Sequence, residues 1–253
     1  MSTQPPLAVV TGAGKRLGLA ITRTLLENNW EIIALARHPS DALNALAATG
    51  QPVHIIQQDI ADPAVWFELW PSLRARFGRL PEALVHAASL FEHDTAATSS
   101  WAAIEAHRRI NYDSFVAAAS AWLQCADAAQ HGAFVALVDQ KVQRLNPDHY
   151  AYTLSKLNLA ASIPFLAQAL APQLRVNGVA PGLTLPSGGQ TDADFHTAQA
   201  AFPLGAGLAP HDIACAVLFL LQQRWITGQL LTVDGGQHLQ SDCDVVRRTT
   251  TPS

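Results

Sequence analysis

Tyr152 and Lys156, in the segment YTLSK, are two side chains with a spacing that suits proton transfer. Four residues apart on a helix, they would project from one face, one above the other. A lysine ammonium beside a phenol favours the phenolate, so the tyrosine could give or take a proton near neutral pH. The same spacing is common on solvated helices, and a surface pair without a function is the alternative interpretation.

A glycine-rich segment, TGAGKRLG, follows the apolar run LAVV near the N-terminus. Gly12, Gly14 and Gly18 would let the backbone pass close to a pyrophosphate, and a helix that begins here would offer N–H donors and the positive end of its dipole. A plain glycine turn between a strand and a helix would carry the same letters. Lys15 and Arg16 stand where such a loop usually has small residues.

The end of the second apolar run indicates which dinucleotide such a loop would bind. An NAD site tends to carry an acidic residue about 20 positions beyond the glycines, whereas an NADP site has a cation there. Positions 32–40 contain no Asp or Glu, and Arg37 is followed by His38 and Ser40. Lys15 and Arg37 could therefore converge on a 2′-phosphate. A solvated loop arginine is the alternative.

Short apolar runs alternate with longer helical patterns, as they do in a parallel sheet with right-handed crossovers. The predicted strands are 7–10, 31–36, 53–57, 83–87, 134–138, 175–179 and 230–233, and the predicted helices are 17–28, 40–48, 63–77, 101–129, 150–170 and 211–222. Several strands are apolar on both faces, which is typical of strands between two helix layers. The sequence predicts an α/β fold, a single-domain doubly wound parallel sheet of the Rossmann type with helices on both faces. The Gly- and Pro-containing stretch 183–207 is expected to be a functional connection.

Composition excludes several other classes of protein. Of the 253 residues, 49% are hydrophobic and 14% charged, which is enough apolar material for a large core. The formal net charge of −4 argues against a nucleic-acid or anionic-membrane surface. No apolar run approaches the ~20 residues of a membrane span, and the start MSTQPP has no leader pattern, so we expect a cytoplasmic protein. Three scattered cysteines suggest neither a disulfide framework nor a metal site.

Several ordered motifs together resemble the short-chain dehydrogenase/reductase family over about residues 7–239. Besides TGAGKRLG and the Tyr152–Lys156 pair, they are Asp59 after the third strand, Asn111 in RINYDSF, the Pro-Gly of NGVAPG at 181–182, and VDGG at 233–236. The resemblance implies NAD(P)-dependent hydride transfer with Tyr152 as the general acid. It also implies that Lys156 holds the nicotinamide ribose, that Asn111 supports a proton-relay water, and that Asp59 contacts the adenine.

The sequence departs from the family pattern at three places. Where the family usually has a serine, about thirteen residues before the tyrosine, this chain has Asp139 in ALVDQ. The usual Asn-Asn-Ala-Gly after the fourth strand reads HAAS at 86–89, and the middle glycine of the cofactor loop is Arg16. These departures put ordinary alcohol or ketone chemistry in doubt, because the serine that would hold a carbonyl oxygen is missing.

The departures are similar to the pattern of the pteridine reductases, a branch that includes the bacterial dihydromonapterin reductases. This resemblance places Arg16 between the cofactor pyrophosphate and the pterin, and it has Ser89 hydrogen-bond the cofactor or the substrate. It makes Phe91 an aromatic lid that stacks the pterin against the nicotinamide, and Asp139 would join Tyr152 in supplying a proton to a ring nitrogen. Phe91 could instead pack the loop, and Asp139 could cap a turn.

We therefore expect an NADPH-dependent reductase of a dihydropterin (dihydromonapterin, dihydrobiopterin or dihydrofolate). The alternatives are a carbonyl or 3-oxoacyl reductase and a non-catalytic nucleotide-sensing protein. The expected catalytic residues are Asp139, Tyr152, Lys156 and Asn111, and the expected substrate-binding residues are Arg16, Ser89, Phe91, Asp139 and Tyr152. The expected NADPH-binding residues are Gly12, Gly14, Lys15, Arg16, Leu17, Arg37, His38, Ser40, Asp59, Ile60, Ala87, Ala88, Ser89, Tyr152, Lys156, Pro181 and Gly182.

Residues 1–239 are expected to form the NADP-binding reductase domain, and residues 240–253 a tail that is partly disordered. The resemblance also implies a homotetramer, with helices 101–129 and 150–170 at one interface and the C-terminal strand region at another. Trp101, Phe115 and Trp122 would suit a helix–helix contact or the core. Residues 92–94 are expected to be a solvated loop, and His149 to face the mouth of the cleft.

Overall fold

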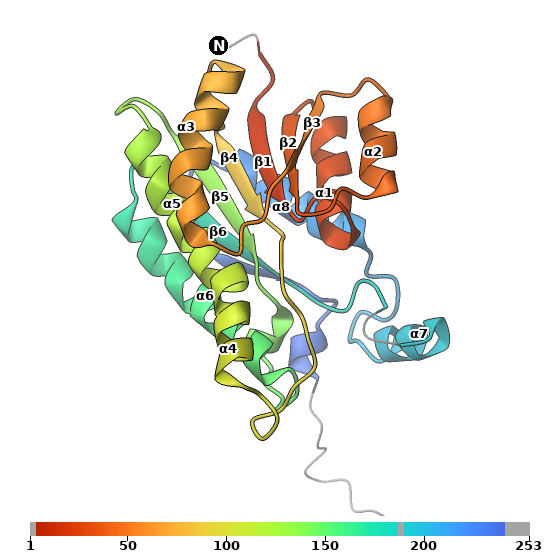
Figure 1. The fold of residues 1–253 in the computed structure, drawn as a ribbon. Helices are drawn as coiled ribbons and strands as arrows, with labels where there is room; N and C mark the ends of the chain where they lie inside the picture. Colours follow the sequence, from red (N-terminus) through yellow and green to blue (C-terminus); the bar gives the residue numbers. More distant parts are fainter. Residues whose placement is uncertain (1–3, 187–189, 241–253) are drawn as a thin grey trace, which may run out of the picture.

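The computed structural model describes residues 4–186 and 190–240 of the chain (Figure 1). Seven parallel strands form one sheet in the order β3-β2-β1-β4-β5-β6-β7. They are β1 (Leu7–Thr11), β2 (Glu31–Ala36), β3 (Val53–Gln57), β4 (Ala83–His86), β5 (Gly132–Leu137), β6 (Leu174–Pro181) and β7 (Leu230–Val233). Each predicted strand overlaps one of these. The strand order reverses between β1 and β4, so the predicted doubly wound parallel sheet is confirmed.

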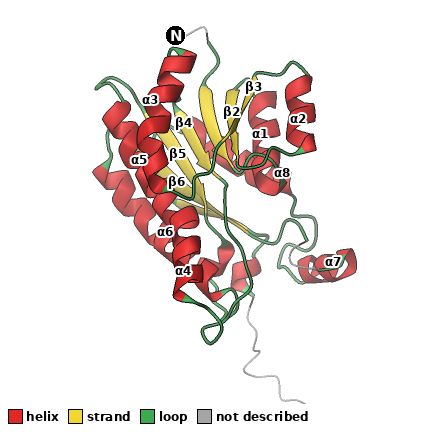
Figure 2. Ribbon diagram, viewed as in Figure 1, coloured by secondary structure: helices red, strands yellow, loops and turns green. Residues whose placement is uncertain are grey.

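Helices cover both faces of this sheet (Figure 2). One layer contains α1 (Arg16–Glu27), α2 (Asp41–Ala48) and α8 (Pro210–Gln222), and the other contains α3 (Trp66–Phe77), α4 (Trp101–Arg108), α5 (Ser114–Cys125) and α6 (Tyr150–Ala169). Alternate residues of each strand enter opposite cores. In β1, for example, Val9 packs into the core with Trp70 and Phe134, while Val10 packs into the core with Ile21 and Val217. The strands are apolar throughout because both of their faces are buried.

Two predicted elements differ from the structure. The predicted helix 101–129 is divided, because a π-helical turn at Arg109–Asp113 separates α4 from α5, and α5 ends at Cys125. The predicted irregular connection at 183–207 contains a helix, α7 (Asp192–Ala200). Thr191 and Asp194 form a reciprocal capping box at its start. Only Phe195 and Gln199 are buried in α7, so the sequence has no apolar stripe that would indicate a helix.

Helices that could cross a membrane are not found in the part of the chain that the structure describes. The predicted C-terminal tail, apart from Gln240, lies outside the described residues. Two of the aromatic residues considered for a subunit contact belong to the core. Phe115 and Trp122 lie on α5, and their side chains are fully buried. Trp101, at the start of α4, is 77% exposed and is the one of the three that is available at the surface.

Candidate active site

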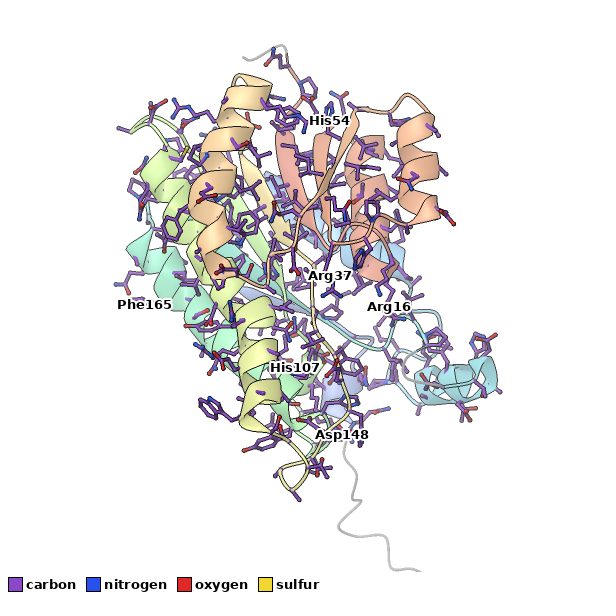
Figure 3. The ribbon with its side chains drawn as sticks, viewed as in Figure 1. Arg16, Arg37, His54, His107, Asp148 and Phe165 are labelled. Carbon is purple, nitrogen blue, oxygen red and sulfur yellow. The ribbon has the colours of Figure 1, made fainter. Side chains whose placement is uncertain are left out.

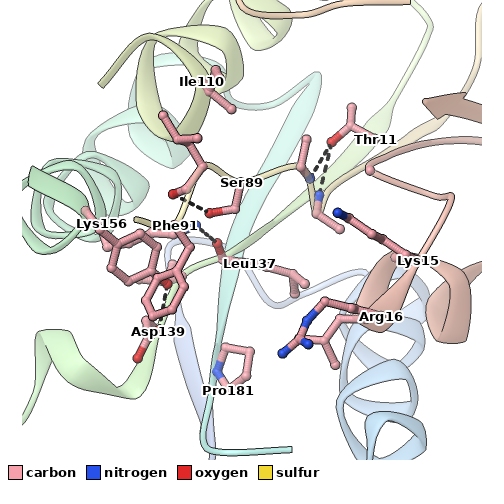
Figure 4. A pocket seen from close by; sticks show the side chains of 18 of the residues that line it. Thr11, Lys15, Arg16, Ser89, Phe91, Ile110, Leu137, Asp139, Lys156 and Pro181 are labelled. Carbon is pink, nitrogen blue, oxygen red and sulfur yellow. Dashed lines mark hydrogen bonds between the residues drawn. The ribbon is translucent and has the colours of Figure 1, made fainter. Parts of the chain in front are cut away.

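A cavity of about 950 Å³ opens at the carboxyl ends of the strands, where β1 and β4 diverge (Figure 4). Its wall is built from the ends of β1, β2, β5 and β6 and from the segments that follow each of the strands β1 to β6. Every residue expected to bind the cofactor or the substrate lines this cavity. Among the expected catalytic residues, Asn111 does not line it. Sequence positions far apart therefore form one site, because parallel strands end at the same edge of a sheet.

The glycine turn after β1 closely approaches the segment after β4. A Cβ on Gly12, whose φ is +64°, would lie 2.8 Å from Cα of Ala88, and a Cβ on Gly18 would lie 2.2 Å from the carbonyl oxygen of Gly12. Thr11 Oγ1 accepts hydrogen bonds from the backbone N–H groups of Ala87 and Ala88 at 3.1 and 3.0 Å, which fixes this approach. Packing therefore demands glycine at positions 12 and 18.

Gly14 has a different role from these two glycines. A Cβ there would have its nearest neighbour, the carbonyl oxygen of His38, at an ordinary contact distance of 3.5 Å. The protein itself thus tolerates a side chain at position 14, but Gly14 lines the cavity. The missing side chain keeps room beside the start of α1, which is where a dinucleotide phosphate binds in this architecture.

Arg16 adopts a glycine-like backbone although it carries the largest side chain of the loop. Its φ is +52°, in the left-handed region where non-glycine residues are strained. Its guanidinium extends into the cavity (Figure 4), and Nη1 donates a hydrogen bond of 2.9 Å to the carbonyl oxygen of Pro186. This backbone conformation directs a cation into the cavity.

Lys15, Arg37 and His38 are exposed residues that line the cavity in the segments directly after β1 and β2. Within the described residues no carboxylate pairs with either Lys15 or Arg37, so both cations remain available to a ligand phosphate. Ser40 differs, because its hydroxyl donates to the carbonyl oxygen of Gly14 and accepts from the N-terminal turn of α2. Ser40 thereby links the cofactor loop to α2.

Asp139 and Tyr152 form a direct hydrogen bond. The phenolic hydroxyl donates to Oδ2 of Asp139 at 2.6 Å, while Oδ1 accepts from the backbone N–H of Lys141 at 2.8 Å. Asp139 therefore caps the turn after β5 and also holds the phenol. Burial raises the pKa of Tyr152 well above its ordinary value, and the adjacent Asp139 raises it further. Tyr152 is a neutral phenol that carries its proton, which corrects the expectation of a phenolate favoured by Lys156.

Lys156 is buried with its ammonium directed at the end of β5. Its Nζ donates a hydrogen bond of 2.7 Å to the carbonyl oxygen of Leu137 and lies 5.6 Å from the centre of the Tyr152 ring. Burial lowers the pKa of Lys156 from 10.5 to about 8, although the charge of Asp139 acts in the opposite direction. Lys156 is still a cation at neutral pH, but loss of its proton lies within reach of mildly alkaline conditions.

The side chain of Asn111 connects the substrate side of the cavity to α6. Its Nδ2 donates to the carbonyl oxygen of Leu90 at 3.0 Å and to Ser155 Oγ at 2.9 Å. Its Oδ1 accepts from Leu90 N and from Ser89 Oγ at 2.8 and 3.1 Å. The amide is fully used by these contacts, so the predicted support of a water would have to come from the backbone of the π-helical turn. The side chain positions the Ser89–Leu90 segment.

The segment after β4 makes contacts with the start of α6 that the sequence did not indicate. Phe91 stacks on His149 with ring centres 4.1 Å apart and an interplanar angle of 14°, and it meets Tyr152 at 85° with centres 4.7 Å apart. Asp94, expected in a solvated loop, is buried and accepts a hydrogen bond from Ala151 N at the start of α6. No local sequence pattern indicates these contacts, since each of them joins segments distant in the sequence.

Comparison with known proteins agrees with this geometry. A family model described as enoyl-(acyl carrier protein) reductase matches residues 12–238, which is nearly the whole chain. The chain belongs to this family of short-chain dehydrogenases/reductases, as its motifs indicated, and is an oxidoreductase of that type.

Particular relatives define the branch more closely. The FolM alternative dihydrofolate reductase 1 of Brucella canis, solved as a complex with NADP, is 30% identical, covers 96% of this chain and 97% of its own, and has a TM-score of 0.88. The FolM protein of Brucella suis, also with NADP, is 31% identical over 98% of this chain and 100% of its own, again with a TM-score of 0.88. The dihydromonapterin reductase of Klebsiella pneumoniae is 26% identical over 94% of this chain and 98% of its own. These similarities support the pteridine reductase-like branch.

A relative with a different activity matches over a comparable length. The 1,2-dihydroxy-1,2-dihydronaphthalene dehydrogenase of Ralstonia sp is 27% identical over 94% of this chain and 99% of its own. Overall similarity therefore does not determine the substrate, which depends on the side chains of the cavity.

Proposed function

We propose that the protein is an NADPH-dependent reductase that transfers a hydride to a dihydropterin, such as dihydromonapterin, dihydrobiopterin or dihydrofolate, and yields the tetrahydro form. The hydrogen bond between Asp139 and Tyr152 beside Phe91 carries this proposal. Reduction of a C=N bond requires a proton at nitrogen, and a phenol held in place by a carboxylate is positioned to deliver it. The names of the FolM and dihydromonapterin reductases support the same substrate class.

The residues of the cavity fit NADPH. Gly14 and the start of α1 leave space for the pyrophosphate. Lys15 and Arg37, which pair with no carboxylate among residues 4–186 and 190–240, are the cations for the 2′-phosphate. The buried ammonium of Lys156 is a donor for a ribose hydroxyl. When bound, NADPH supplies the hydride. The two FolM structures, each in complex with NADP, support this choice of cofactor.

The protein's own part in the reaction is to orient the substrate and to provide a proton. Phe91 offers a flat apolar face to a flat heterocycle. Arg16 lines the same cavity and would supply a cation between the cofactor pyrophosphate and the substrate, as the resemblance implies. The proton along the Tyr152–Asp139 hydrogen bond is the one available to the substrate nitrogen. Because the pKa of Tyr152 is raised, the phenol still holds this proton throughout the neutral range.

A carbonyl or 3-oxoacyl reductase is the second candidate, and the name of one relative, a putative ketoacyl reductase of Streptomyces violaceoruber, supports keeping it. Membership in an oxidoreductase family argues against the third alternative, a nucleotide-sensing protein without turnover. NADPH oxidation should be followed with a dihydropterin, with an acetoacetyl thioester and with neither. Rapid oxidation with the dihydropterin alone is expected. Turnover of the thioester alone would refute the pterin proposal.

We further propose that the reductase is a homotetramer and acts in the cytoplasm. Trp101 at the start of α4 is 77% exposed, and Phe165 on α6 is 68% exposed and projects away from the sheet (Figure 3). Large apolar side chains on two neighbouring helices support a contact between subunits through this face. Light scattering at micromolar concentration is expected to give the mass of four chains. A monomer would contradict the proposed assembly.

A further inference from the structure

The ring of Phe91 has no secondary structure to hold it. Phe91 lies in the irregular segment between β4 and α4, and its side chain is 44% exposed at the cavity. Asn111 fixes the backbone of the preceding residue, Leu90, but this contact leaves the direction of the Phe91 ring open. The orientation of the ring therefore depends on its ring neighbours.

His149 makes two contacts with this segment at consecutive residues. Its ring stacks on Phe91, and its Nδ1 lies 2.9 Å from the carbonyl oxygen of Glu92. A carbonyl oxygen only accepts hydrogen bonds, so Nδ1 carries a hydrogen and donates it. This hydrogen bond fixes the orientation of the imidazole ring, and one face of the ring packs against Phe91.

His149 is in turn fixed to the helix that carries the catalytic phenol. It is the residue before α6, and its carbonyl oxygen accepts from the N–H and the hydroxyl of Thr153, both at 2.8 Å. Its φ of +49° lies in the left-handed region, which is unfavourable for a histidine. Two further hydrogen bonds, from Tyr150 N and Ala151 N to Asp94, hold the start of α6 against the same segment. The strained backbone is maintained by these contacts and directs the imidazole at Phe91.

We propose that His149 is a positioning residue that fixes the plane of Phe91 relative to Tyr152 for stacking of the substrate. This inference rests on the proposed function. His149 covers one face of Phe91, so a flat heterocycle that stacks on this ring would take the opposite face. Since Phe91 stands at 85° to Tyr152, its orientation determines the plane of a stacked ring relative to the proton donor.

Kinetics of a double-mutant cycle test this role. His149→Ala is expected to raise KM for the dihydropterin about three- to tenfold, the range of one aromatic stacking contact. It should also lower kcat, because the stacked ring is no longer held in one plane relative to Tyr152, while NADPH affinity stays nearly unchanged. In a Phe91→Ala background the same substitution should have little further effect, because His149 acts through Phe91. His149→Phe, which keeps a ring, should restore most of the affinity. The matched control is His131→Ala. His131 is an exposed histidine that also contacts a backbone carbonyl oxygen, but it directly precedes β5 and so lies at the end of this strand away from the cavity.

A second measurement needs no substrate. The carbon-bound ring protons of His149 should show a ring-current shift in the NMR spectrum that disappears in Phe91→Leu. Additive effects in the cycle, or an unchanged His149 spectrum in an active enzyme, would overturn the role of His149 alone. A wild-type enzyme that shows the shift but does not reduce dihydropterins would overturn the proposed function and, with it, the substrate part of this inference.

Discussion

Asp139 accepts a hydrogen bond of 2.6 Å from the hydroxyl of Tyr152 through one carboxyl oxygen and caps the turn after β5 through the other. Asp139 therefore caps a turn and also contacts Tyr152, and its part in supplying a proton stays a prediction. A serine at this position could cap the turn, but it has no second oxygen with which to hold the phenol. The proposed difference from an ordinary ketone-reducing site thus depends on this carboxyl group.

Substitution of Asp139 should impair turnover and spare cofactor binding. Asp139→Asn keeps an oxygen for the turn and loses the carboxyl group, and Asp139→Ser introduces the usual family residue. Both should lower kcat for a dihydropterin by about 10²–10⁴-fold, the usual contribution of a positioned acid or base. Steady-state kinetics and NADPH titration would measure this, with the exposed Glu68→Gln on α3 as a control. Full activity of both variants would leave Asp139 as a turn residue only.

NADPH should be strongly preferred to NADH, and Arg37 should account for much of the preference. A charge-assisted hydrogen bond to phosphate contributes about 1.5–3 kcal/mol. Arg37→Ala should therefore weaken NADPH binding by roughly 10- to 150-fold while NADH binding changes little. Arg23→Ala, which removes an exposed cation of α1 outside the cavity, is the matched control. Equal kcat/KM for the two cofactors in the wild-type enzyme would exclude a 2′-phosphate site.

Activity should fall in mildly alkaline solution because Lys156 loses its charge. Burial lowers the pKa of Lys156 to about 8, so its ammonium is present below this pH and absent above it. Tyr152 does not contribute to the fall, since its pKa is raised well above its ordinary value. The profile of kcat/KM between pH 6 and 10, which reports groups of the free enzyme, should bend downward near pH 8. A profile that stays level up to pH 10 would show that Lys156 keeps its proton.

His86 should make the protein sensitive to acid. Its side chain is buried at the end of β4, and burial, with a further effect of the charge of Lys156, lowers its pKa to about 3. The folded protein keeps this imidazole neutral, whereas the unfolded chain binds a proton near pH 6.5. Stability is therefore lost as the pH falls from about 6.5 toward 3, and the loss is about 2 kcal/mol at pH 5.

Comparison with His86→Asn isolates this contribution. The variant carries the residue that the family usually has at this position and no group that titrates in the range. Urea unfolding of both proteins at pH 7 and pH 5 should show a smaller decrease in the free energy of unfolding for the variant. Equal decreases would mean that other groups cause the acid sensitivity.

The sequence by itself determined the order of the elements and the edge of the sheet at which the site lies. Both are consequences of local patterns: strands that are apolar on both faces belong between helix layers, and the carboxyl ends of parallel strands meet at one edge. Residues as distant as Gly12, Arg37 and Tyr152 could therefore be assigned to a single cavity from the sequence alone.

Only the tertiary structure decided how these side chains act on one another. The neutral state of Tyr152 follows from its burial and from Asp139, and the stacking of Phe91 on His149 joins segments that are distant in the sequence. The left-handed backbone of Arg16 depends in the same way on the surrounding chain. Local patterns do not encode desolvation or the meeting of distant segments, because both arise only when the layers pack together.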